Sequence, residues 1–102
     1  MGKSQRFKVI LTADAERQYF QATEYLLNES EKGYRNFIKK FRERAALIAD
    51  KPKLYSADKY KLNNNGAYRA FVIYNYRVTY KIEDKEVIIL LIRHTSQEPK
   101  QY

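Results

Sequence analysis

Hydrophobic and polar positions follow a helical period in the first half of the chain and an alternating period after Pro52. Residues 7–11 (FKVIL) form a short apolar run, which predicts a strand. Apolar residues then recur at helical spacing in two segments and predict two amphipathic helices. The first stripe comprises Ala15, Tyr19, Ala22 and Leu26, widened by Phe20 and Leu27, and the second comprises Tyr34, Ile38, Phe41, Ala45 and Ile48.

Polar residues mark the ends of these helices. Thr12 and Ser30 stand where the two helices begin, and both are preferred N-cap residue types. Asp14 and Glu16 occupy the first turn, where carboxylates suit the helix dipole. Pro52 ends the second helix, because proline cannot continue one. The short NESEKG link predicts an antiparallel helical hairpin.

Three more strands are predicted after Pro52, over residues 67–74, 76–82 and 87–92, separated at Asn75 and at the EDKE turn. The NNNG segment precedes them as a turn, since Asn and Gly tolerate positive φ. In the second of these strands one face carries Tyr76, Val78, Tyr80 and Ile82, and the other carries Arg77, Thr79 and Lys81. Residues 87–92 (VIILLI) are apolar throughout, which predicts a central strand covered on both faces.

The resulting order is β-α-α-β-β-β, and it predicts an α+β fold in one domain spanning residues 1–102. We expect the N-terminal strand and the helical hairpin to pack on a small, mainly antiparallel twisted sheet. The helices cover one face, so the other face is partly open. Arg69 or its neighbours, Arg77 and Lys81 are expected to line a basic concave surface there.

Positive charge is concentrated in the middle of the chain. The net charge is +8, and the segment from Lys32 to Lys81 holds thirteen basic and three acidic residues, a net of +10. The remainder therefore carries a net of −2. So local an excess favours a polyanionic or acidic partner, such as nucleic acid, the ribosome or an acidic protein, over a merely soluble basic surface.

Several functional classes are disfavoured by the sequence. The sequence has no phosphate-binding glycine loop and no G-x-S-x-G motif. One histidine without any cysteine cannot make a common zinc site. We therefore expect no cofactor and no metal. Acidic residues 83, 84 and 86 lie in a predicted turn and do not suggest a paired-carboxylate hydrolase. No signal peptide or membrane span is expected, and the lack of cysteine fits a reducing, cytoplasmic location.

Two sets of residues remain as candidates. Six of the ten tyrosines lie between Tyr55 and Tyr80, and their rings can stack on unpaired bases. The basic residues interleaved with them can hold phosphates, and they are Lys53, Lys59, Lys61, Arg69 and Arg77. The alternative is that these tyrosines are half-buried sheet residues. Metal-free RNA cleavage needs a proton acceptor, a proton donor and positive charge, for which the chain offers His94, Tyr102, Arg77 and Arg93. The alternative, which we favour for His94, is that it packs at the strand end or contacts a partner.

Four segments together are similar to one known family. They are the opening FKVILTADAE, the helix exit IADKPKLY, the closing hairpin NYRVTYKIEDKEVIILLIRH and the tail HTSQEP. In this order and spacing they resemble the RelE/ParE superfamily of toxins from type II toxin–antitoxin modules, over nearly the whole chain. The resemblance implies a twisted sheet with an N-terminal helical hairpin, and a toxin held by a cognate antitoxin that wraps across it.

Two mechanisms follow from this resemblance. RelE-like members cut mRNA in the ribosomal A site, and ParE-like members inhibit DNA gyrase. Arg77 matches the phosphate-binding arginine of the nuclease branch, His94 matches a strand-end histidine of the ParE-like branch, and Tyr102 lies near a C-terminal tyrosine of the nucleases. Ser96 and Gln97 stand where many members carry arginines.

This departure and the HTSQEP tail favour a ParE-like toxin that binds and inhibits gyrase without catalysis. The alternative is a ribosome-dependent endoribonuclease that uses Arg77, Lys59 or Lys61, Arg93, His94 and Tyr102. A third interpretation is an inactive or general RNA-binding module. The expected RNA-binding or partner-binding residues are Lys59, Lys61, Arg69, Arg77 and Lys81, and the expected assemblies are a homodimer or a toxin–antitoxin hetero-oligomer.

Overall fold

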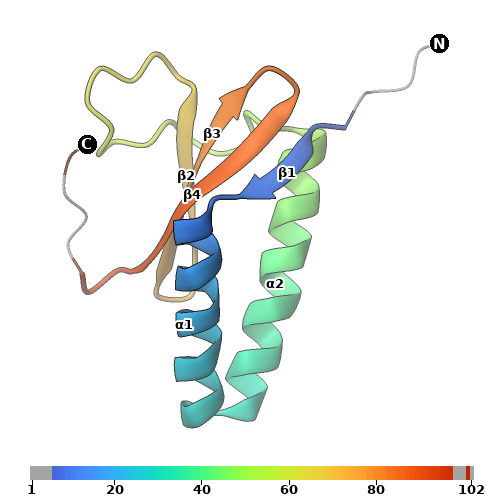
Figure 1. Cartoon of the computed structure of the whole chain (residues 1–102), viewed down its shortest axis with the longest axis vertical. Coiled ribbons are helices and arrows are strands. Elements are labelled where there is room, and N and C mark those ends of the chain that lie inside the picture. The colour runs from blue at the N-terminus through green and yellow to red at the C-terminus, as the bar shows by residue number, and fades with distance from the viewer. Residues whose placement is uncertain (1–5, 98–100, 102) are drawn as a thin grey trace.

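The computed structural model describes residues 6–97 and residue 101. The elements in chain order are β1 (Lys8–Leu11), α1 (Ala13–Glu29), α2 (Glu31–Asp50), β2 (Tyr68–Ile73), β3 (Tyr76–Glu83) and β4 (Glu86–His94). Figure 1 shows α1 and α2 side by side, with the tip of their hairpin projecting away from the sheet. The predicted order of elements and the α+β class are therefore confirmed. Among the described residues, no helix is long and apolar enough to cross a lipid bilayer.

The four strands form one mixed sheet in the order β1-β4-β3-β2. Strand β1 runs parallel to β4, whereas β2, β3 and β4 pair antiparallel in two hairpins. A parallel neighbour requires a long crossover connection, and the helical hairpin begins that connection from β1. Strand β4 is thus central, as predicted, and its last residue is His94.

Both predicted caps are present. The Thr12 hydroxyl oxygen accepts the Ala15 N–H at 3.1 Å, and the Ser30 hydroxyl oxygen accepts the Gly33 N–H at 3.1 Å. Ser30 ends α1 and begins α2, so a single residue reverses the chain. Each cap satisfies an N–H group that would otherwise lack a partner in the first helical turn.

The core lies between the helices and one face of the sheet. Ala15, Ala22, Phe41 and Ile48 are buried, as the helical stripes predicted. The widening of the first stripe was wrong, because Phe20 and Leu27 are exposed. Phe37 was missed although it is fully buried, and its ring packs against Tyr19, Phe41 and Tyr76.

A β-bulge in β4 changes which residues face the core. Tyr80 pairs with Ile89, but the preceding Thr79 pairs with Leu91, so Leu90 is an extra residue in β4. The buried side chains are consequently those of Val87, Ile89 and Ile92, whereas Ile88, Leu90 and Leu91 are only partly buried. The prediction that VIILLI is covered on both faces was wrong, since both helices lie on the same side of the sheet (Figure 1).

Tyr80 joins the sheet to the segment that leaves α2. Its side chain is fully buried, and its hydroxyl donates to the Pro52 carbonyl oxygen at 2.7 Å. Burial raises the pKa of Tyr80 to about 12, although the nearby Arg69 acts in the opposite direction. The neutral phenol is therefore the form that the fold stabilises.

We expect this phenol to make the fold sensitive to alkali. The pKa of Tyr80 is higher in the folded state, so its contribution is complete below about pH 10 and disappears as the pH rises to about 12. Two pKa units correspond to about 3 kcal/mol in the free energy of unfolding. Tyr80→Phe should lose about 1 kcal/mol at neutral pH and should show a smaller alkaline loss, measured by denaturant unfolding. Exposed Tyr25→Phe is the control, and an unchanged alkaline loss in Tyr80→Phe would contradict this explanation.

Candidate functional site

The sheet face turned away from the helices includes alternate residues of β2 and β3. Directly paired residues of antiparallel strands share a face. Val72 pairs with Arg77, and Tyr68 pairs with Lys81. The predicted placement of Arg77 and Lys81 on the face opposite the helices is therefore confirmed.

Arg69 does not belong to this face, and of the two possibilities that the sequence left open, its neighbour Tyr68 lies there. It pairs with Tyr80, whose side chain lies in the core. Its guanidinium donates to the carbonyl oxygens of Tyr55 at 2.7 Å and Gly66 at 3.0 Å. Arg69 thus holds the connection between α2 and β2, while its neighbour Tyr68 takes the position on the opposite face.

Residues 51–67, which connect α2 to β2, fold back along β2. The Asp58 N–H donates to the Tyr68 carbonyl oxygen at 2.8 Å, and the Ala70 N–H donates to the Ser56 carbonyl oxygen at 3.3 Å. The predicted NNNG turn closes this segment, with positive φ at Asn63 and Gly66. The connection thereby brings Asp58 next to β3, within bonding distance of Arg77.

Asp58 and Arg77 form an ion pair with an N–O distance of 2.7 Å. The Asp58 side chain is 1% exposed and the Arg77 side chain is 18% exposed. The Arg77 guanidinium also lies 4.8 Å from the ring centroid of Tyr60, and the same Asp58 oxygen accepts the Tyr60 N–H at 3.1 Å. Sequence reasoning missed Asp58, and its only signal was an isolated acid within a strongly basic segment.

Lysines and tyrosines surround this pair, and we call them the basic–aromatic cluster: Lys59, Tyr60, Lys61, Tyr68 and Lys81. Two lysine ammonium groups approach the Tyr68 ring centroid, that of Lys61 at 4.8 Å and that of Lys81 at 5.5 Å. The Lys59 ammonium lies 5.3 Å from the Tyr60 ring centroid. A hydrogen bond with Glu83 raises the pKa of Lys81, which keeps it charged. The structure thus brings three of the predicted binding lysines close to tyrosine rings.

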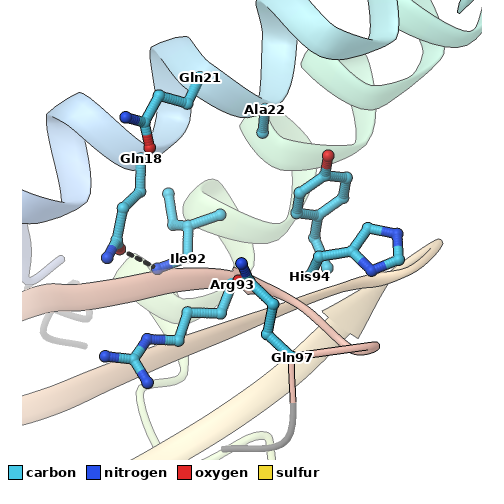
Figure 2. Close-up of a pocket in the computed structure, with 8 residues that line it drawn as sticks. Gln18, Gln21, Ala22, Ile92, Arg93, His94 and Gln97 are labelled. Carbon is cyan, nitrogen blue, oxygen red and sulfur yellow. Dashed lines mark hydrogen bonds between the residues drawn. The ribbon is translucent and has the colours of Figure 1, made fainter.

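A second feature is a cavity of about 480 Å³ between α1 and the end of β4 (Figure 2). Strand β1 ends at Leu11, so α1 supplies the partners for the next residues of β4. The Thr12 hydroxyl donates to the Leu90 carbonyl oxygen at 3.2 Å, and the Gln18 side-chain oxygen accepts the Ile92 N–H at 2.7 Å. Arg93 and His94 line the cavity at the strand end, and their side chains leave β4 in different directions.

His94 is held in one tautomer by its neighbour Ser96. Its Nδ1 accepts the Ser96 N–H at 3.1 Å and lies 2.7 Å from the Ser96 hydroxyl oxygen. A backbone N–H can only donate, so Nδ1 carries no proton and the neutral ring carries its proton on Nε2. The ring also packs edge-on against Tyr76 at 5.2 Å. In this arrangement the Nε2–H of His94 is a hydrogen-bond donor, while Nδ1 is occupied by Ser96.

Among the predicted nuclease residues that the structure describes, His94 is separated from Arg77 and Arg93 by the register of the sheet. Arg77 pairs with Arg93 on the sheet face opposite the helices, whereas His94 pairs with core-facing Tyr76. Arg77 is also neutralised by Asp58. Tyr102 lies outside the described residues.

Comparison with known families decides the family of this chain. The model of the ParE toxin of the type II toxin–antitoxin system, parDE, matches residues 9–99. The chain belongs to the ParE toxin family. A search of curated proteins finds no match. This ParE-family chain is therefore the toxin component of a type II toxin–antitoxin module, with an antitoxin as its partner, and its fold agrees with that of RelE/ParE-like toxins.

Proposed function

We propose that this ParE-family toxin inhibits bacterial growth by binding DNA gyrase and does not cleave RNA. The observation that carries the proposal is the ion pair between Arg77 and buried Asp58. An arginine that stabilises a phosphate transition state must offer its N–H groups and its charge to the substrate. Here a carboxylate from the same chain already occupies one of those groups and cancels the charge.

The position of His94 supports the same conclusion. Acid–base catalysis by His94 would require a nitrogen that exchanges a proton with the substrate. Nδ1 is engaged by Ser96, and the strand register directs His94 and Arg77 to opposite faces of the sheet. Binding to a protein target needs no such convergence. Residues 1–102 act in this proposal as a single toxin domain.

A ribosome-dependent endoribonuclease is the second candidate function. The basic–aromatic cluster favours it, because lysines beside tyrosine rings suit the backbone and bases of single-stranded RNA. The same positive surface also suits an acidic partner protein. We propose that the cognate antitoxin is a small, partly acidic protein that forms a hetero-oligomer with the toxin.

Induction of the toxin in bacterial cells, with and without its antitoxin, tests the proposal. We expect growth arrest that the antitoxin relieves, DNA double-strand breaks or lost plasmid supercoiling, and mRNA 5′ ends that match those of uninduced cells. Cuts in mRNA phased with the ribosomal A site, with normal supercoiling, would replace the gyrase mechanism by the nuclease mechanism. Normal growth with soluble, folded toxin would contradict both.

A further inference from the structure

Two recesses lie next to each other beside the segment that leaves α2. The first, which we call the apolar recess, has a volume of about 390 Å³ and is lined by Phe7, Lys51, Pro52, Lys53, Leu54 and Ile82. The second, which we call the cationic recess, has a volume of about 270 Å³ and is lined by Lys53, Asn65, Gly66, Ala67, Arg69 and Ile82. Because Lys53 and Ile82 line both, the two recesses adjoin and share a wall.

Three side chains offer unused hydrogen-bond donors to the cationic recess. The Arg69 guanidinium donates through Nε and Nη1 to two backbone carbonyl oxygens, at 3.0 and 2.7 Å, and its Nη2 has no acceptor among the described residues. The Asn65 side-chain oxygen accepts the Ala67 N–H at 3.0 Å, which leaves the N–H groups of this amide available. The ammonium group of exposed Lys53 is the third donor.

We propose that these recesses bind an extended, acidic segment of a partner protein. An apolar side chain of the segment fills the apolar recess, and a carboxylate two positions away is held in the cationic recess by Lys53, Asn65 and Arg69. Alternate residues of an extended segment point to the same side and lie about 7 Å apart, so they reach neighbouring recesses. The site shares no residue with the basic–aromatic cluster or with the cavity at the end of β4.

Charge and geometry favour a carboxylate in the cationic recess. Residues 51–67 carry four lysines and one acidic residue, Asp58, which is paired with Arg77. A positive surface of this kind attracts acidic partners. The Arg69 guanidinium is already fixed by two backbone carbonyl oxygens, so little further side-chain freedom is lost when Nη2 binds an oxygen. Hydrogen bonds between charged groups are also stronger than those between neutral groups.

The apolar recess favours a protein segment over a nucleic acid. Its walls are mainly the aliphatic side chains of Pro52, Leu54 and Ile82, and Leu54 is 46% exposed. Bases of a single-stranded nucleic acid stack instead on flat aromatic faces. An aliphatic recess therefore suits a leucine-sized side chain, whose binding would remove apolar surface of both partners from water.

Binding of short labelled peptides to the full-length toxin tests the inference. The probe peptide carries a leucine and, two positions later, an aspartate, flanked by glycine and serine. We expect saturable binding at low salt, measured by fluorescence anisotropy. Replacing the peptide's aspartate by asparagine should weaken binding about tenfold, and replacing its leucine by alanine should weaken it by a similar factor. Absence of saturable binding, or equal affinity for these peptides, would overturn the inference.

Variants of the toxin assign the binding to the two recesses. Lys53→Gln should weaken the aspartate peptide about fivefold and leave the asparagine peptide nearly unchanged, because only groups in contact are coupled. Leu54→Ser should weaken the leucine peptide and leave the alanine peptide nearly unchanged. Both side chains are exposed, so we expect both variants to fold. Lys32→Gln is the matched control, since it removes an equal charge at the start of α2, where the tip of the hairpin projects away from the sheet (Figure 1).

Two further results would refute the assignment. One is an equal loss of affinity in Lys32→Gln and Lys53→Gln, which would indicate a general effect of net charge. The other is displacement of the peptide by a single-stranded oligonucleotide at the concentration at which the peptide itself binds, which would assign the cationic recess to phosphate. The assay contains no gyrase, so its result does not depend on the mechanism of growth inhibition.

Discussion

Phe37→Ala should lower the free energy of unfolding by about 4 kcal/mol, because truncating a buried phenylalanine removes apolar contacts and leaves a cavity. Phe37 is fully buried. Its ring centroid lies 5.4 Å from that of Tyr76 and 6.1 Å from those of Tyr19 and Phe41. It therefore joins α2 to α1 and to the sheet, and little of the resulting cavity can collapse.

Phe20→Ala is the matched control, because it makes the same chemical change on α1 at a side chain that is 66% exposed. We expect it to change the free energy of unfolding by less than about 1 kcal/mol. Denaturant unfolding followed by circular dichroism measures both variants. Similar losses from the two variants would contradict the packing described for the helical hairpin.

Arg77→Met should lower the free energy of unfolding by about 3 kcal/mol. The substitution leaves the Asp58 carboxylate buried without its arginine, and breaking a buried ion pair from one side is strongly destabilising. The result bears on function as well. A single Arg77 variant that loses toxicity could do so through loss of fold, so it would not identify Arg77 as catalytic.

The double variant Arg77→Met/Asp58→Asn separates these effects. Removing both charges should restore most of the lost stability, because neither partner is left as an isolated buried charge. Under the gyrase mechanism this variant should remain toxic. Thermal and denaturant unfolding measure the first expectation and growth curves measure the second. If the two single substitutions add fully in the double variant, Arg77 and Asp58 do not act as a stabilising pair.

Local signals allowed most of the fold to be predicted. Thr12 and Ser30 cap helices through bonds to residues three positions away, so their sequence neighbourhood suffices to identify them. The turns at Asn63–Gly66 and around Asp84 likewise depend on residues that tolerate positive φ. Each of these features is determined within a few residues of chain.

Phe37 lies three residues after Tyr34 and four before Phe41, so the helical period itself includes it, and the structure packs its ring against Tyr19 and Tyr76. The other errors concern contacts between distant segments. The extra residue at Leu90 shifts the alternation of β4, and it depends on pairing with β3. Arg69 lies on the same face of the sheet as core residue Tyr80 because the two residues are paired, and this pairing joins distant segments.

The candidate site was predictable only in part. Arg77 and Lys81 were placed on the correct face because the side chains of β3 alternate without interruption from Tyr76 to Lys81. Asp58 was not predictable, since it reaches Arg77 across nineteen positions of sequence. The ion pair that neutralises Arg77 is thus determined by tertiary structure alone.

Supercoiling of relaxed plasmid by purified gyrase, with increasing amounts of the isolated full-length toxin, tests the central claim most directly. The gyrase mechanism predicts that the toxin blocks supercoiling or traps cleaved DNA in proportion to its concentration, that the antitoxin reverses this effect, and that Arg77→Met/Asp58→Asn acts like the wild type. Unchanged gyrase activity at a large excess of folded toxin, together with mRNA cleavage on purified ribosomes, would contradict it.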